Sequence, residues 1–508
     1  MTAHATSQRR RRQALRPRPQ SPAAPESLFA LCDQGPVFRT RRVRIESDRR
    51  GRAMAYGGLA LAHKLAHSLD LPAALDREVE LLKRHAPYHE SDHILTHAYN
   101  IFAGGTCIED IASLQNSEAF MKLVGASRVP DPTTAGDFLR RFSPGTLGAA
   151  DGVLDDVRAK VWKALPRNSR RQATVDLDST IRPVYGECKQ GAAFSYKGTW
   201  SYHPLLISLA ETNECLRLIN RPGNATSADG VEEALDPCLG RLTEHFRHVV
   251  VRGDSAFYRG ELMRLCLAHG VDFALVMKSS AGLVEAAEAL RGGCWEPFSS
   301  QPGKPQRRGS RRRRRQRCKR ARLRRAEAQR RGYRTLSTVS EWVAEMRYRP
   351  SGLDRDFRVV VKRQLIREKK QKALFEHYEY RFVITSIENM TAAGLVRFAY
   401  GRCNQENTIE QLKNGLAALR MPTGELLANA AFMLAAVIAW SLRSWLSLLA
   451  LPAESLRWEW KRFRHAFVYV SSRIVTGARQ VTARIAGSHR FTSQILAASE
   501  RLDALAPD

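Results

Sequence analysis

The stretch Thr174–Pro183, TVDLDSTIRP, decides how the chain is interpreted, because it alternates apolar residues with two aspartates. Side chains of a strand point to opposite faces in turn, so Asp176 and Asp178 share one face and two apolar residues share the other. A half-buried pair of acids is costly unless positive charge meets it. The residues alone allow two interpretations: a turn or capping aspartate before hydroxyl residues, or a strand with a metal ligand at its end.

The chain of 508 residues is strongly basic. Lys and Arg number 81 and Asp and Glu 51, which gives a formal net charge of +30. Such an excess predicts a polyanionic partner, either nucleic acid or an acidic membrane surface. Because 44% of the residues are hydrophobic, the chain can bury sizeable cores, and its length indicates about two to four structural units. A wholly disordered protein is excluded.

Cysteine and hydropathy patterns limit the compartment and the kind of site. The nine cysteines are scattered from Cys32 to Cys403 without a CxxC pair, so we expect neither a zinc site nor a disulfide framework, and a reducing cytosol. The apolar run Leu426–Leu442 contains Asn429 and meets Arg443, and it is shorter than the about 20 residues of a membrane span. We therefore expect a buried core helix there and no membrane contact.

The middle of the chain alternates strand patterns with helical ones. The strand-like stretches are ATVDLDST, YHPLLISLAE, HVVVRGDSAF and VDFALVMK, and the helical RGELMRLCLAHG lies between the last two. This order predicts a layered α/β domain. An Arg-rich run at 307–331 and further strand patterns follow, and YEYRFVITSI then resumes a buried-strand pattern. We interpret the intervening segment as an insertion.

A second strand also ends in an acid, and a helical segment carries a third candidate acid. Asp254 follows the apolar strand HVVVRG, where α/β sheets commonly place functional groups, although such an aspartate is also typical of a turn. In YGRCNQENTIEQLK, the charged residues Arg402, Glu406 and Lys413 are separated by four and seven residues. At about 100° per residue they fall within about 40° of one another on a helix. A solvated charged face is the alternative.

The order of these elements resembles the DDE transposases of bacterial insertion sequences, in the branch with a β-rich insertion before the catalytic Glu. That branch carries the pattern Y-x-x-R-x-x-x-E-x-x-x-x-x-x-K. Arg402, Glu406 and Lys413 match its spacing, and Tyr400 lies one residue closer to Arg402 than the pattern has it. Small hydroxyl residues follow the first aspartate of the family, which selects Asp178 over Asp176. The resemblance covers about residues 50 to 450.

This resemblance implies a ribonuclease H-like α/β catalytic core interrupted by a β-rich insertion, preceded by an all-α region and followed by C-terminal helices. It implies that Asp178, Asp254 and Glu406 bind two Mg²⁺ ions, with Mn²⁺ as an alternative, since carboxylate and phosphate oxygens favour hard cations. Arg402, Lys413 and Tyr400 would contact the DNA backbone. Trp342 of the insertion would stack an extruded base.

The expected function is that of a cut-and-paste transposase in the bacterial cytoplasm, at the nucleoid. It would act as a homodimer on double-stranded DNA, cleaving at the terminal inverted repeats of its element and joining the 3′-OH ends to target DNA. Two alternatives stay open: a non-catalytic DNA-binding protein derived from a transposase, and a related magnesium-dependent nuclease that cuts without joining.

The same reasoning divides the chain. The expected parts are a basic flexible arm at 1–50, a helical DNA-binding region at 51–165, a catalytic core at 166–279 and 379–450, a basic β-rich insertion at 280–378, and a helical C-terminal region at 451–508.

Overall fold

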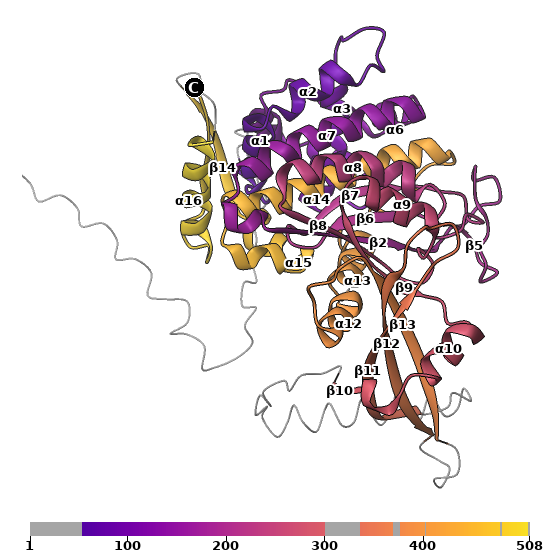
Figure 1. Cartoon of the computed structure of the whole chain (residues 1–508). Helices are drawn as coiled ribbons and strands as arrows, with labels where there is room; N and C mark the ends of the chain where they lie inside the picture. The colour runs from indigo at the N-terminus through magenta and orange to yellow at the C-terminus, as the bar shows by residue number, and fades with distance from the viewer. Residues whose placement is uncertain (1–52, 300–335, 369–375, 402, 478–479, 506–508) are drawn as a thin grey trace, which may run out of the picture. The chain divides into compact units, whose positions relative to one another are not determined.

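One nine-stranded sheet forms the centre of the structure, a computed structural model that describes residues 53–299, 336–368, 376–401, 403–477 and 480–505 (Figure 1). Its order is β10-β11-β12-β13-β9-β8-β2-β6-β7. The five strands at one end are β2 (Gln172–Ser179), β6 (Leu205–Leu209), β7 (Glu214–Ile219), β8 (His248–Gly253) and β9 (Asp272–Met277). Strands β2, β8 and β9 are parallel, whereas β6 is antiparallel to both β2 and β7. These strands form the α/β core that the sequence pattern predicts, and their order agrees with the ribonuclease H-like core that the resemblance implies.

The alternation in β2 explains how this core packs. Val175 and Leu177 are fully buried, and they join a cluster with apolar residues of α8 (Val231–His245) and α9 (Gly260–Ala268). Burying side chains of this size removes about 1.5–3 kcal/mol each of unfavourable hydration. The opposite side chains of β2, including both aspartates, therefore point to the other face of the sheet.

The β-rich insertion continues the core sheet. Its strands are β10 (Glu296–Phe298), β11 (Leu336–Tyr348), β12 (Phe357–Glu368) and β13 (Glu376–Thr385), and α10 (Ala281–Glu288) and the 3₁₀ turn η2 (Gly292–Cys294) precede them. Strand β13 pairs with β12 along its whole length and, through its last four residues, also with β9. The boundary predicted at residue 378 thus falls inside one continuous strand. The Arg-rich run 307–331 lies outside the described residues.

The N-terminal region is helical, as expected, and packs on the long helix α14 (Leu426–Leu449). By length and composition α14 could cross a membrane, yet most of it is buried inside the protein. The predicted core helix continues past Arg443, which is buried and donates hydrogen bonds to the carbonyls of Ser455, Leu456 and Trp458. The N-terminal helices are α1 (Leu59–Ser68), α2 (Leu71–Glu78), α3 (Glu90–Ala103), α4 (Ile111–Gln115), α5 (Glu118–Val124), α6 (Pro132–Leu139) and α7 (Pro144–Ala164), followed by the 3₁₀ turn η1 (Arg167–Arg170).

The C-terminal region differs from the purely helical prediction for 451–508. It contains η4 (Ala453–Arg457), α15 (Trp460–Phe463), the π-turn η5 (Arg464–Val468) and α16 (Thr492–Asp503), but also the hairpin strands β14 (Ser472–Gly477) and β15 (Gln480–Ile485). The short strand β1 (Ala53–Met54) adds to β14. The β-branched residues of β14 and β15 favour a pleated strand once a partner covers one face.

Candidate active site at the strand ends

Asp178 and Asp254 lie at the carboxyl ends of neighbouring parallel strands. The register pairs Asp176 with Arg252, so every partner in β8 is 76 residues further along the chain. The ladder ends at this pair, and Asp178 and Asp254 each lie two residues beyond it along the chain. Asp178 belongs to β2 and points to the face of the sheet on which Asp176 lies, whereas Asp254 is the first residue after β8. Both side chains are half-buried.

Asp176 and Arg252 form a buried ion pair just beneath this level. The guanidinium nitrogens Nε and Nη2 of Arg252 donate to the two carboxylate oxygens of Asp176 at 2.7 and 2.8 Å. Only 1% of the Asp176 side chain and 7% of the Arg252 side chain are exposed. This pair explains how β2 carries two acids on one face: the inner one is neutralised by an arginine of the adjacent strand.

A backbone amide shortly after each acid holds one of its carboxylate oxygens. The backbone amide of Ser179 donates to Asp178 Oδ1 at 2.8 Å, and that of Ala256 donates to Asp254 Oδ1 at 2.9 Å. The turn interpretation of Asp254 therefore holds in part, because this acid closes its own loop. The bend needs Gly253, since a Cβ there would lie 2.8 Å from that of Phe257.

His203 supports the chain directly after Asp178. Its Nε2 lies 3.0 Å from Ser179 Oγ and its Nδ1 lies 2.7 Å from the carbonyl oxygen of Ala225, while Ser179 Oγ donates to Ser227 Oγ. Burial lowers the pKa of His203, and its hydrogen bond to Ala225 opposes that shift. This histidine has a structural role, because both of its ring nitrogens are hydrogen-bonded within the protein.

The third acid belongs to a helical segment that begins on the same face. Helix α12 (Ala392–Tyr400) is tied to the sheet by Arg252, whose Nη1 donates to the carbonyl oxygen of Phe398 at 2.7 Å and whose guanidinium lies 4.7 Å from the Phe398 ring. Glu406 follows on α13 (Cys403–Glu410). Its side chain and the whole of Arg402 lie outside the described residues.

The predicted row of three charges on one regular α-helix needs correction. After Glu410 the chain enters the π-helical turn η3 (Gln411–Gly415), which contains the half-buried Lys413. A π turn holds more residues than an α turn, so the spacing of about 100° per residue does not extend from Glu406 to Lys413. The turn keeps Leu412 buried, and π-bulges of this kind are frequent at functional sites.

Tyr400 and Trp342 lie in packed surroundings. The hydroxyl of Tyr400 is buried and has no hydrogen-bond partner among the described residues. Burial raises the pKa of Tyr400, although Arg381 opposes the shift. Trp342 is half-buried on β11, and the Arg363 guanidinium lies 5.1 Å from its ring. The same guanidinium lies 3.9 Å from the ring of Trp295 and 4.8 Å from that of Tyr378.

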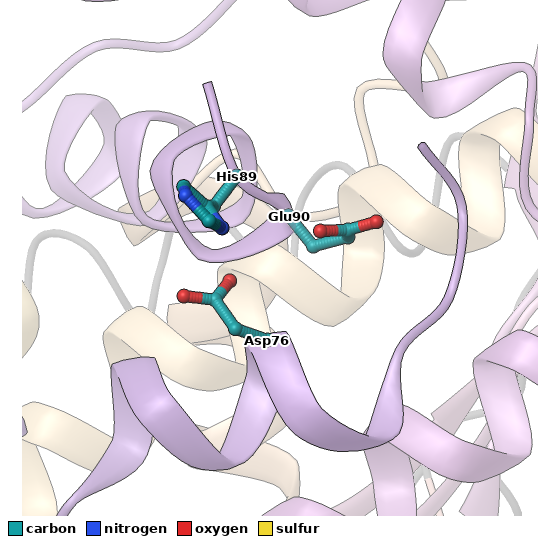
Figure 2. A group of neighbouring side chains, drawn as sticks. All are labelled: Asp76, His89 and Glu90. Atoms are coloured by element: carbon teal, nitrogen blue, oxygen red, sulfur yellow. The ribbon is translucent and has the colours of Figure 1, made fainter. Parts of the chain in front are cut away.

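A second group of metal-ligand type lies elsewhere, in the helical region. Asp76 from α2 and His89 and Glu90 at the start of α3 converge (Figure 2), with ligating atoms within 4.8 Å of one another. Glu90 Oε1 accepts the amides of Leu81 and Leu82, and Asp76 accepts the amide and hydroxyl of Ser91. These bonds anchor the loop between α2 and α3, and this structural role explains the presence of Asp76 and Glu90 without a metal ion.

Asp178 and Asp254 have the chemistry that a divalent ion requires. They offer carboxylate oxygens at the carboxyl ends of two adjacent parallel strands, and amide donors hold one oxygen of each in place. Such hard donors fit Mg²⁺ or Mn²⁺ better than zinc. The arrangement can therefore hold a metal ion against a phosphate.

Comparison with known families identifies the chain. Residues 36–507 match the family model described as Transposase DDE domain group 1. The chain belongs to this transposase family. Among solved structures, the transposase is similar to one described as a piggyBac transposase synaptic complex with hairpin DNA, at 10% identity and a TM-score of 0.32, over 91% of this chain and 87% of that one. No curated protein matches it.

Sequence reasoning missed Arg252, although the signal was present. In this transposase Asp176 precedes Asp178 by two residues, and Arg252 precedes Asp254 by two. Equal spacing to two acids on parallel neighbours places the inner residues opposite each other. The detectable pattern is therefore a pair of strand-end acids, one preceded two residues earlier by an acid and the other preceded two residues earlier by a base.

Proposed function

We propose that the transposase cleaves DNA at the ends of its mobile element and joins the 3′-OH ends to target DNA by two-metal phosphoryl transfer. Asp178, Asp254 and Glu406 would hold the two ions, Mg²⁺ or Mn²⁺. The observation that carries the proposal is the position of Asp178 and Asp254 at the carboxyl ends of the neighbouring parallel strands β2 and β8. Membership of the DDE transposase family supports the same chemistry.

The ion pair of Asp176 favours Asp178 as the first ligand. Both oxygens of Asp176 already accept from Arg252, and Asp176 is 1% exposed, so DNA and solvent cannot reach it. Asp178 lies two residues nearer the strand end and is half-buried. When bound, two ions would activate a water or a 3′-hydroxyl and stabilise the leaving oxygen in an in-line displacement.

The remaining residues would position DNA. Arg402 suits bidentate contact with a backbone phosphate, and Lys413 would supply a point charge beside it. Tyr400 would reach a phosphate only after its hydroxyl leaves its buried position. Trp342 would stack an extruded base once Arg363 releases its ring. We further propose a homodimer that acts on the terminal inverted repeats in the bacterial cytoplasm.

A cleavage and strand-transfer assay on DNA that carries the element's ends tests the assignment. We expect Asp178→Asn, Asp254→Asn and Glu406→Gln each to lower the metal-dependent rate by several orders of magnitude at unchanged DNA affinity. Asp156→Asn is the matched control, because its carboxylate is 61% exposed and paired with Arg241 on the surface. It should behave as the unaltered protein.

The outcomes separate the alternatives. Undiminished activity in all three acid variants would reject the assigned site. Cleavage without joined products would instead identify a related nuclease. Binding of DNA with no metal-dependent cleavage by the unaltered chain would identify a non-catalytic DNA-binding protein.

A further inference from the structure

The candidate catalytic strand continues outward into a second, small sheet. Strands β3 (Arg182–Pro183) and β5 (Trp200–Tyr202) pair antiparallel, and β4 (Ala193–Phe194) joins the other edge of β5. In the β2–β6 ladder the numbers of paired residues add to 384, as for Asp178 with Leu206. Arg182 with Tyr202 gives the same sum. The small sheet therefore extends the hairpin that carries Asp178 (Figure 1).

This small sheet exposes aromatic side chains. Tyr185 is 90% exposed, Phe194 67% and Tyr196 77%, and these are the three most exposed large hydrophobic residues of the described chain. The Phe194 ring lies 5.3 Å from that of the half-buried Trp200, edge to face. Single exposed apolar side chains scattered over a surface are normal, whereas several on one short segment are typical of a binding surface.

The backbone beneath these rings is held firmly. Lys189 Nζ donates to the carbonyl oxygens of Met421 and Thr423 at 2.8 and 2.7 Å. Tyr202 is buried, and its hydroxyl donates to the carbonyl oxygen of Gln190 at 2.8 Å. A Cβ at Gly223 would overlap carbonyl oxygens of the small sheet. The rings thus project from a scaffold that loses little conformational entropy when a ligand binds.

Positive charge accompanies the rings. The Nζ of Lys197 lies 5.4 Å from the Tyr196 ring centre. The positive charges of Arg182 and Arg420 are close enough to repel each other. The Nε of Arg182 is buried without a hydrogen-bond partner among the described residues. Two neighbouring guanidinium groups and a lysine beside exposed rings suit a ligand that carries both negative charge and flat apolar rings.

We propose that the small sheet binds an unpaired stretch of DNA strand close to the cleaved phosphate, which rests on the proposed function. The bases would stack on Tyr185, Phe194 and Tyr196, and Arg182 would contact the strand's phosphates. A site that stacks bases on exposed rings and contacts the DNA backbone with cations can bind any base sequence. It requires bases that are not paired in a duplex. At about 3.3 Å per residue, the four residues from Asp178 to Arg182 separate the two by about 13 Å.

Binding of a fluorescein-labelled oligothymidylate and of a blunt duplex to the full chain, measured in EDTA, tests the site. Each of Tyr185→Ala, Phe194→Ala and Tyr196→Ala should weaken oligothymidylate binding at least about fivefold, and the triple variant at least about 100-fold. Duplex affinity should stay within about threefold. Arg182→Met should reduce the slope of log affinity against log salt by about 0.7.

Three controls keep the result specific. Tyr196→Phe retains the ring and should bind as the unaltered protein. Leu496→Ala removes a side chain that is 52% exposed on α16 and should change nothing. Since all three replaced rings are at least two-thirds exposed, the variants should keep the melting temperature of the unaltered chain.

The results distinguish this proposal from the proposed function. Ring variants that bind oligothymidylate normally while the unaltered chain cleaves DNA would overturn the small-sheet site alone. A fall in molecular mass by light scattering at unchanged DNA affinity would assign the rings to a second copy of the chain, and also overturn it. Lost oligothymidylate binding in the ring variants of a chain that never cleaves would support the site and reject the catalytic proposal.

Discussion

Replacing Arg252 with methionine should loosen the centre of the core sheet. The substitution leaves the Asp176 carboxylate buried beside an apolar side chain, with both of its short hydrogen bonds removed. It also removes the hydrogen bond to the carbonyl of Phe398, which ties α12 to β8. A buried ion pair that loses one partner costs about 3–5 kcal/mol, because the remaining charge is left without compensation.

Hydrogen–deuterium exchange can resolve this loss strand by strand. A decrease of 3–5 kcal/mol in the free energy of local opening predicts amide exchange in β2 and β8 that is about 100- to 4,000-fold faster. The matched control is Arg347→Met, since the pair of Arg347 with Glu388 is 57% and 53% exposed. Exposed pairs contribute at most about 1 kcal/mol, so exchange in the core should not change.

A double variant makes the reasoning refutable. In Asp176→Leu with Arg252→Met both charges are absent, so no uncompensated charge remains and part of the lost stability should return. Exchange in β2 and β8 that stays within fivefold of the unaltered protein in Arg252→Met would refute the interpretation of the pair. The interpretation would also be refuted if the double variant lost as much stability as the two single variants lose in sum.

Two further predictions concern the helical region. Burial lowers the pKa of His97 to about 4, so the unfolded chain binds a proton between pH 6.5 and 4 that the folded chain does not. Stability present above pH 6.5 should fall by about 2 kcal/mol at pH 5, and His97→Gln should remove that part of the pH dependence of unfolding in urea. Gly58→Ala places a methyl group against the carbonyl oxygen of Phe467 and should cost about 1–3 kcal/mol by thermal melting. Gly148→Ala, which meets nothing within 4 Å, should not lower the melting temperature.

The strand-end acids were predictable because their signal is local. An apolar run that ends in Asp-Ser or Gly-Asp fixes both the strand and the side-chain direction within a few residues. The order of strands and helices followed from the same alternation. The buried partner of Asp176 is a long-range contact, and only the equal spacing before Asp178 and Asp254 hinted at it.

Other features depend on contacts that no local pattern contains. The π turn at Gln411–Gly415 arises where the helix keeps Leu412 in the core, and regular periodicity does not predict such a change. The β14–β15 hairpin lies in a segment that the sequence predicts to be helical. Pairing with a neighbouring strand decides whether such a segment forms a strand. The exposure of Tyr185, Phe194 and Tyr196 could not be read from their hydrophobicity, which would place them in a core.

Strand β13 has a consequence for the core sheet. Its first residues belong to the far hairpin, and its last four, from Phe382 to Thr385, are bonded to β9. The strand is continuous from Glu376 to Thr385, so no break separates the residues that pair only with β12 from those that also pair with β9. Excision of the insertion at residue 378 would divide β13 and remove β12, and the segment from Phe382 to Thr385 would lose the neighbour on its outer edge. The edge of the core sheet beside β9 and β8 therefore depends on the insertion for its outer hydrogen bonds.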